Sequence, residues 1–204
     1  MKIRFFWMLL VLLAAGTRSV ANERATVIVV AGAPGEDEYA TVFAQQVEAW
    51  TQVCAQAGAK PIVIGADVGE ATSDRDRLQQ ALAAETKTGA DELWIVLVGH
   101  GTFNGKEAKF NLRGLDLAAT ELAEWLKPFQ RPLAIIDTAS ASAPFLSKLA
   151  GKGRVVVSST RSGNEQNYAR FGKFFAEAIG DPKSDLDKDG QISLLEAFLS
   201  GSQR

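Results

Sequence analysis

Five runs of valine, isoleucine and leucine alternate along the 204-residue chain with segments of helical periodicity. The runs occupy residues 25–33, 60–67, 91–101, 131–140 and 154–163. Continuous apolar runs are typical of parallel strands buried on both faces, and a helix usually connects two such strands. The alternation therefore predicts a three-layer α/β/α domain, in which helices cover both faces of a mainly parallel sheet.

The segments between the runs carry helix and turn signals. Apolar residues recur every three or four positions from Asp37 to about Ala57, and Gly58 ends that pattern. Ser73 is suited to cap the start of the next helix because acidic residues follow it in the first turn. Residues 102–114 alternate in polarity around an Asn-Gly pair, which predicts a small hairpin.

Composition excludes several classes of protein. The chain has one histidine, His100, and one cysteine, Cys54, so it can form no disulfide of its own and imidazole chemistry must run through His100. A structural zinc site takes about four Cys or His ligands, and this chain could supply two at most, so its composition excludes such a site. The formal net charge is -2, so there is no broad basic surface for a nucleic acid. Cys54 lies in a helical pattern and is interpreted as a small core or surface residue.

Residues 1–21 have the pattern of a secretory signal peptide. Basic residues precede an apolar run of 12 residues, and Ser19 and Ala21 stand at the -3 and -1 positions of a possible cleavage site. We therefore expect a periplasmic or secreted protein with no integral membrane segment after cleavage. The alternative is an uncleaved anchor, although a bilayer span takes about 20 residues.

Polar and small residues follow the apolar runs, at the edge where open parallel sheets bind their ligands. His100 and Gly101 follow the third run, residues 137–142 the fourth and residues 160–165 the fifth. The histidine is therefore expected beside a serine-rich strand end. The alternative is a histidine that only caps its strand.

The string LWIVLVGHGTF, followed about 35 residues later by LAIIDTASASAPF, resembles the caspase-like and legumain-like clan of cysteine peptidases. In that clan one apolar strand ends in His-Gly and the next in Asp/Glu-Ala-Cys, and the histidine and cysteine form a catalytic dyad. The resemblance covers residues 25–180 and implies a caspase-like fold. It also implies that Arg161 lies near a specificity pocket, where an arginine would favour an acidic group. Pairing of Arg161 with Glu165 is the alternative.

The catalytic cysteine of that clan is absent. Aligned from Asp137, the nucleophile position is Ala139, and aligned from Ser142 it is Ser140. In the first alignment the domain has no nucleophile.

Two functions follow from these alignments. In one, the domain binds a peptide or protein partner through Gly101, Ala139 and Arg161. In the other, Ser140 is the nucleophile of a hydrolase, His100 is its base, and amides near Gly101 and Ser140 form an oxyanion hole. Serine is far less acidic than cysteine, so a bare His–Ser pair is feeble.

Residues 185–196, DLDKDGQISLLE, match a calcium-binding loop of the EF-hand type. Positions 1, 3, 5, 7 and 12 are Asp185, Asp187, Asp189, Gln191 and Glu196. Gly190 stands at position 6, where the sharp turn needs glycine, so we expect Ca2+ to bind. A single loop should bind weakly, on the order of 10⁻⁴–10⁻³ M as in extracellular modules. An acidic turn without metal is the alternative.

Together these patterns predict a signal peptide over residues 1–21, a caspase-like domain over 22–180, and an EF-hand-like calcium loop with a terminal helix over 181–204. We expect an exported, non-peptidase homologue that binds Ca2+ and a peptide or protein partner. The Ser140–His100 hydrolase is one alternative, and a calcium-stabilised structural domain without a ligand is another. The oligomeric state is left open.

Overall fold

A computed structural model of the chain describes residues 24–67 and 72–204, so the predicted signal peptide over residues 1–21 lies outside the described residues. The central sheet has the strand order β2-β1-β3-β7-β8, and every pairing in it is parallel. Its strands are β1 (Thr26–Ala31), β2 (Lys60–Ile64), β3 (Leu93–Val98), β7 (Leu133–Asp137) and β8 (Arg154–Ser158). The predicted parallel sheet is confirmed.

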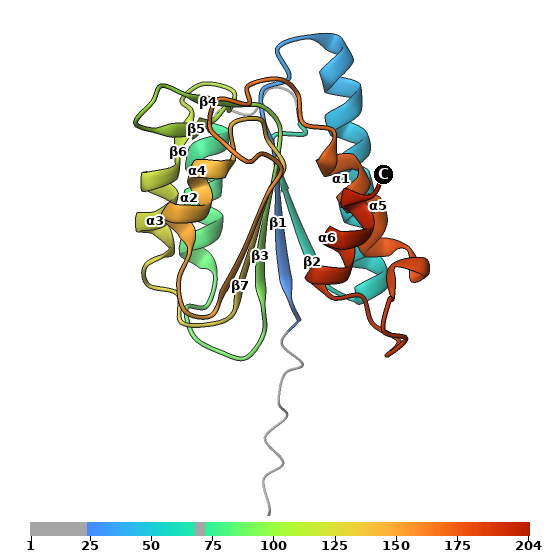
Figure 1. Cartoon of the computed structure of the whole chain (residues 1–204). Helices are drawn as coiled ribbons and strands as arrows, with labels where there is room; N and C mark the ends of the chain where they lie inside the picture. The colour runs from blue at the N-terminus through green and yellow to red at the C-terminus, as the bar shows by residue number, and fades with distance from the viewer. Residues whose placement is uncertain (1–23, 68–71) are drawn as a thin grey trace, which may run out of the picture.

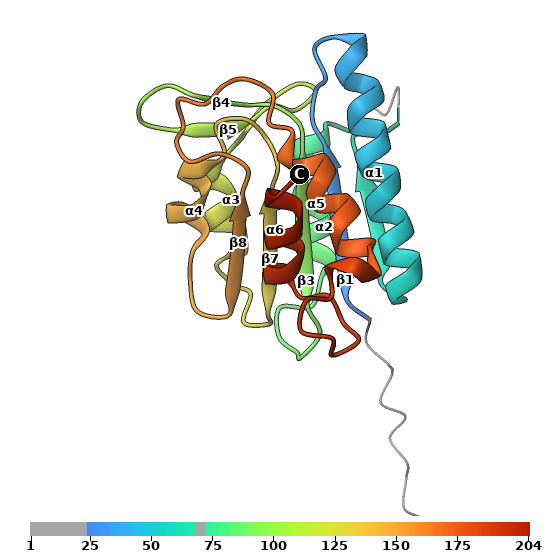
Figure 2. The same cartoon turned by 45° about the vertical axis from the view of Figure 1, so that its right-hand side comes forward.

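Helices cover both faces of this sheet, which confirms the three-layer α/β/α arrangement (Figures 1 and 2). One layer contains α1 (Asp37–Ala57), α5 (Phe171–Gly180) and α6 (Leu194–Ser202). The other contains α2 (Asp74–Ala84), α3 (Ala119–Leu126) and α4 (Ala143–Leu149). A short 3-10 helix, η1 (Pro182–Ser184), precedes the predicted calcium loop. Within residues 24–67 and 72–204, none of the helices combines the length and the apolar composition that a membrane crossing requires.

Each face of the sheet carries its own apolar core. Side chains alternate along β1, so Ile28 and Val30 pack toward α2 and α3 while Val27 and Val29 pack toward α1 and α5. Each fully buried large apolar side chain contributes about 1.5–3 kcal/mol to the stability. Cys54, interpreted from the sequence as a small core or surface residue, is 1% exposed in the second of these cores and is therefore a core residue.

The helix ends and the hairpin lie where the capping and turn residues of the sequence predict them. Gly58 closes α1 in the left-handed conformation (φ 66°), and the Ser73 hydroxyl accepts a hydrogen bond from the Asp76 amide at the start of α2. The predicted hairpin consists of β4 (Gly101–Phe103) and β5 (Ala108–Phe110). A third strand that the sequence did not predict, β6 (Leu117–Ala118), completes a small antiparallel sheet.

The hairpin is packed closely over the carboxyl ends of β1 and β3. The strand order reverses between these two strands, and such a reversal opens the crevice in which α/β sheets bind ligands. A Cβ atom on Gly99 would lie 2.9 Å from Cε2 of Phe110, and one on Gly32 would lie 2.6 Å from the Asn111 carbonyl oxygen. Only glycine fits at these two strand ends.

Gly99→Ala is therefore expected to lower the free energy of unfolding by about 1–3 kcal/mol, because the added methyl group overpacks against the buried Phe110 ring. Guanidinium unfolding followed by circular dichroism measures this. Gly151→Ala is the matched control, since its Cβ atom would approach nothing closer than 3.4 Å. Equal stabilities of the two variants would contradict the close packing at the strand ends.

Candidate functional site

His100 follows β3 after one intervening residue, Gly99, and is partly buried among aromatic rings. Its ring centroid lies 4.5 Å from that of Tyr39, 5.2 Å from that of Phe43 and 6.1 Å from that of Tyr168. Burial lowers the pKa of His100, while a backbone hydrogen bond at Pro34 and the charge of Glu36 oppose that shift. The neutral imidazole is therefore favoured at pH 7.

Ser140 is fixed by the main chain of Gly101. The residue is 1% exposed. Its hydroxyl oxygen accepts a hydrogen bond from the Gly101 amide at 3.0 Å and donates one to the Gly101 carbonyl at 3.2 Å. These bonds join the end of β7 to the start of β4. The amide predicted to serve an oxyanion hole is thus already bonded to the predicted nucleophile.

No hydrogen bond joins Ser140 to His100 among the residues that the structure describes. A base and its nucleophile need a separation of about 2.6–3.2 Å to transfer a proton. The structure therefore brings both predicted catalytic residues to one edge of the sheet, but it gives their polar groups different partners.

Ala139 faces the apolar core and not the crevice. It is 1% exposed in the cluster that contains Phe145. Its amide donates to Asp137 Oδ1 at 3.1 Å, and its carbonyl accepts from the Ser159 hydroxyl at 2.5 Å. Gly101 and Ala139, both predicted as binding residues, are buried, so their contribution to the site is to shape its backbone.

Asp137 is a buried carboxyl group at the end of β7. Oδ1 caps the Ala139 amide, and Oδ2 has no hydrogen-bond partner among the described residues. Burial raises the pKa of Asp137 to about 7, and the Ala139 amide opposes that shift. Below that pH the protonated acid is therefore the stable form of this side chain.

A cluster of hydroxyl groups joins the ends of β7 and β8. The Ser142 hydroxyl lies 3.2 Å from that of Ser158, 3.1 Å from that of Ser159 and 3.3 Å from that of Thr160. The sequence predicts a serine-rich strand end here, but not this network of hydroxyl groups. The signal was present, because hydroxyl residues follow both of these neighbouring strands.

A polar groove of about 630 Å³ lies along the segment after β8. Its lining consists of Ser159, Thr160, Asn164, Glu165, Gln166, Asn167, Tyr168, Ala169, Arg170 and Phe171. The Glu165 carbonyl accepts from the Ala141 amide at 2.7 Å, and the Tyr168 ring reaches His100. The groove therefore adjoins the residues at the ends of β3 and β7.

Arg161 is exposed on this segment but does not line the groove. Glu165 Oε1 accepts hydrogen bonds from the amides of Arg161 and Ser162, both at 2.8 Å. Glu165 therefore bonds the main chain of Arg161, and no ion pair joins the two side chains among the described residues. Arg170 is the arginine that lines the groove.

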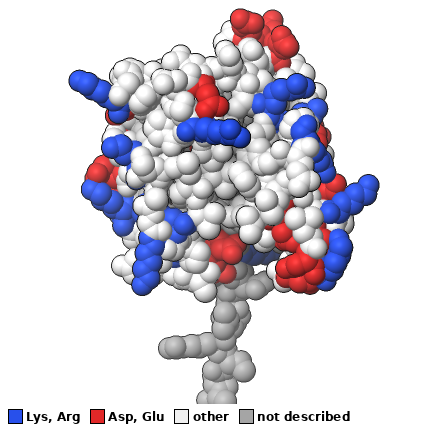
Figure 3. All heavy atoms as spheres, viewed as in Figure 1, with Lys and Arg blue, Asp and Glu red and all other residues white. Residues whose placement is uncertain are grey.

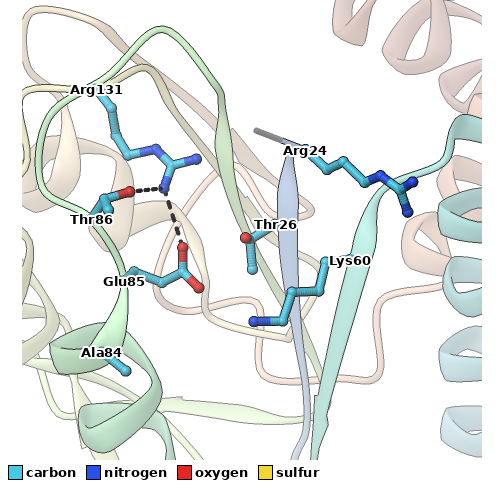
Figure 4. A pocket seen from close by; sticks show the side chains of 7 residues that line it. All are labelled: Arg24, Thr26, Lys60, Ala84, Glu85, Thr86 and Arg131. Carbon is cyan, nitrogen blue, oxygen red and sulfur yellow. Dashed lines mark hydrogen bonds and ion pairs between the residues drawn. The ribbon is translucent and has the colours of Figure 1, made fainter. Parts of the chain in front are cut away.

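A second hollow, of about 250 Å³, opens at the opposite edge of the sheet (Figure 4). Arg131 lines this hollow. Its guanidinium already bonds Glu85, Thr86 and the carbonyls of Asp91 and Glu92. This arginine fastens the loops that enter the sheet, so we assign the hollow a structural role.

The loop at residues 185–196 gathers three carboxylates. One oxygen each from Asp185, Asp187 and Asp189 lies within 4.8 Å of the others. Asp185 Oδ1 is buried without a hydrogen-bond partner, and Gly190 has the left-handed φ of 88° that the turn needs. Figure 3 shows acidic side chains gathered at the lower right, where this loop lies in Figure 1. The donor set and the unpartnered oxygen suit a hard divalent cation.

Glu196 stands apart from this triad. Oε1 accepts from the amides of Leu186 and Asp187, and Oε2 accepts from the amide and hydroxyl of Ser193. The Ser193 hydrogen bonds come first among the causes that lower the pKa of Glu196 to about 2. In this structure Glu196 closes a capping box at the start of α6.

No protein-family model and no curated protein matches the chain. The resemblance to the caspase-like clan thus rests on the strings around His100 and Asp137 alone, and it stays a prediction. The structural evidence for a binding site consists of the parallel sheet, the histidine after β3 and the groove beside it.

Asp137→Asn tests the buried acid. With its pKa raised in the folded state, this group contributes most stability below about pH 4 and loses it as the pH rises to about 7. The amide variant cannot ionise, so we expect it to gain up to about 4 kcal/mol over the natural protein at pH 8 and little at pH 4. Urea unfolding at both pH values measures the difference. The exposed Asp37→Asn is the control, and a pH-independent difference would contradict the assignment.

Proposed function

We propose that this chain is an exported, caspase-like domain that binds a peptide or protein partner at the carboxyl edge of its sheet without cleaving it. The observation that carries the proposal is the bonding of Ser140. Its hydroxyl both accepts from and donates to Gly101, so it has no hydrogen left for His100. Ala139, the other candidate for the nucleophile position, has no reactive group and is buried.

The alternative hydrolase would require the Ser140 hydroxyl to break its two hydrogen bonds with Gly101 and to turn toward His100. Each hydrogen bond contributes about 0.5–1.5 kcal/mol net, and a buried amide left without a partner costs about 1–3 kcal/mol. The base would then have to activate a weakly acidic hydroxyl. Both costs favour the non-catalytic function.

The groove after β8 supports a peptide ligand. Its amide, hydroxyl and carboxylate side chains offer both donors and acceptors, which a peptide main chain needs along its whole length. Tyr168 adds an aromatic surface beside His100, and Arg161 and Arg170 supply positive charge near it. Together they favour an extended segment with an acidic side chain.

Ca2+ at residues 185–196 forms the second part of the proposal. Asp185, Asp187 and Asp189 would hold the ion, and Gln191 and Glu196 are the remaining predicted ligands. The bound ion would neutralise three carboxylates whose oxygens already converge. Since α6 packs closely on α5, an ion here would fasten the end of the chain to the domain.

Export is proposed from the pattern of residues 1–21 and from the weak binding expected of a single loop. Millimolar calcium outside the cytoplasm would fill such a site, so we propose a periplasmic or secreted location with a structural ion.

Peptide binding can be tested with fluorescein-labelled Ala-Ala-Ala-Asp and its all-alanine counterpart. We expect the acidic peptide to bind more tightly, and Arg170→Ala in the groove lining to weaken it about tenfold by loss of a charged hydrogen bond. Arg161→Ala tests the arginine beside the groove in the same way. Fluorescence polarisation gives the affinity, with Arg24→Ala at the opposite edge as the control.

Mass spectrometry of the same mixtures decides between the two functions. Intact peptide after long incubation is the expected outcome. Cleavage that Ser140→Ala abolishes would replace the binding function by the hydrolase. An Arg161→Ala variant that binds the acidic peptide as tightly as the natural protein does would remove Arg161 from the site.

Calcium should raise the melting temperature, and EDTA should lower it, with half-saturation on the order of 10⁻⁴–10⁻³ M. Asp185→Asn should abolish the response because it removes the unpartnered oxygen's charge from the triad. The exposed Asp67→Asn, outside the loop, is the control. A melting temperature that ignores both calcium and EDTA would refute the structural ion.

A further inference from the structure

The last helix of the chain carries an exposed apolar stripe. On the inner side of α6, Ala197 and Gly201 are buried where the helix packs on α5. On its outer side Leu195 is 65% exposed, Phe198 38% and Leu199 41%. These three positions are three and four residues apart, so their side chains share one face of the helix. A contiguous apolar patch of this kind is typical of an interaction site, whereas single exposed apolar residues are common.

The stripe is continuous with the polar groove after β8. α5 and α6 lie side by side (Figure 2), and Phe171, the first residue of α5, lines the groove. The Phe171 ring centroid lies 5.5 Å from that of Phe198, with the ring planes inclined at 60°. This edge-to-face contact joins the lining of the groove to the apolar side chains of α6. A ligand that leaves the groove past Phe171 therefore meets an apolar surface.

The charges near the stripe differ between its two neighbours. Arg170 lines the groove, and the exposed Lys173 follows three residues later on α5. The start of α6, by contrast, follows the loop that gathers the carboxylates of Asp185, Asp187 and Asp189. Charge complementarity therefore favours an acidic group of a ligand at Arg170 and disfavours one beside the start of α6.

We infer that the peptide bound in the groove continues onto α6, where its large apolar side chains pack on Leu195, Phe198 and Leu199. The inference rests on the peptide-binding function proposed above, and it narrows the class of ligand. The ligand is an extended segment with an acidic side chain at Arg170 and large apolar side chains beyond it. Burial of these side chains against the stripe would add affinity that the polar groove alone does not supply.

The size of the stripe favours this occupant over a second copy of the chain. α6 has nine residues, so it is about 13 Å long. A stable dimer interface takes about 20–30 residues from each partner, far more than one face of such a helix offers. The same face is large enough for two or three side chains of a peptide that the groove already holds.

Labelled peptides test the inference through the ligand. Ala-Ala-Ala-Asp-Gly-Leu-Ala-Leu and the reversed order Leu-Ala-Leu-Gly-Asp-Ala-Ala-Ala cover both chain directions, and alternate leucines of an extended segment share a face. The control peptides carry serine in place of leucine. We expect the leucine peptide of one order to bind about tenfold more tightly than its serine counterpart in fluorescence polarisation.

The peptide measurements separate the two levels of the argument. Equal affinities of leucine and serine peptides in both orders would overturn the extension onto α6 and leave the peptide function of the groove in place. Binding of none of these peptides, nor of Ala-Ala-Ala-Asp, would remove the proposed peptide function and this inference with it.

Leu195→Gln and Leu199→Gln test the inference through the protein. Both side chains are exposed, so neither substitution leaves a cavity in the core. Each should abolish most of the advantage of the leucine peptide and leave the affinity for Ala-Ala-Ala-Asp unchanged. Leu115→Gln is the matched control, because Leu115 is 71% exposed in the loop before β6. An advantage that survives in both α6 variants, or that Leu115→Gln also abolishes, would overturn the inference.

Sedimentation of the natural protein and of Leu195→Gln tests the competing occupant. We expect the same oligomeric state for both proteins, because the stripe receives a peptide and not another copy. A dimer that Leu195→Gln dissociates would show that a second copy covers the stripe, and would overturn the inference.

Discussion

The two hydrogen bonds between Ser140 and Gly101 organise the carboxyl edge of the sheet. They connect the end of β7 to the strand that leaves β3, and so they set the position of the histidine between these points. The hydroxyl cluster around Ser142 does the same for β7 and β8. The ends of β3, β7 and β8 are thereby connected through side-chain oxygen atoms. These connections lie beyond the last main-chain hydrogen bonds of the sheet.

This use of hydroxyl groups gives the serines at this edge structural partners. A nucleophile must keep a free hydrogen-bonding direction toward its base. At this edge the serines instead satisfy main-chain groups that would otherwise be buried without partners. The same residues that suggest catalysis in the sequence therefore have a sufficient structural role, and His100 is left among aromatic rings with a neutral imidazole favoured.

The sequence predicted the layers, the five parallel strands, the hairpin and the helix caps at Gly58 and Ser73, because each depends on periodicity or on a local turn. It could not predict which side of β7 each residue faces after the strand ends. Ala139 turns to the core and Ser140 to Gly101, and that choice depends on the tertiary contact between Ser140 and Gly101. The two-residue strand β6 was not predicted because so short a segment cannot show the alternation of polar and apolar residues that indicates a strand.

The loop at residues 185–196 shows a similar division between local and tertiary information. Spacing alone predicted the gathering of Asp185, Asp187 and Asp189, since a tight turn with Gly190 brings alternate residues together. Spacing also placed Glu196 among the ligands, but its carboxylate serves the capping box and two loop amides. A carboxylate at the first turn of a helix is already stabilised there, so a metal ion must compete with the helix for it. That competition is a physical reason to expect weak binding of an ion at a single loop of this kind.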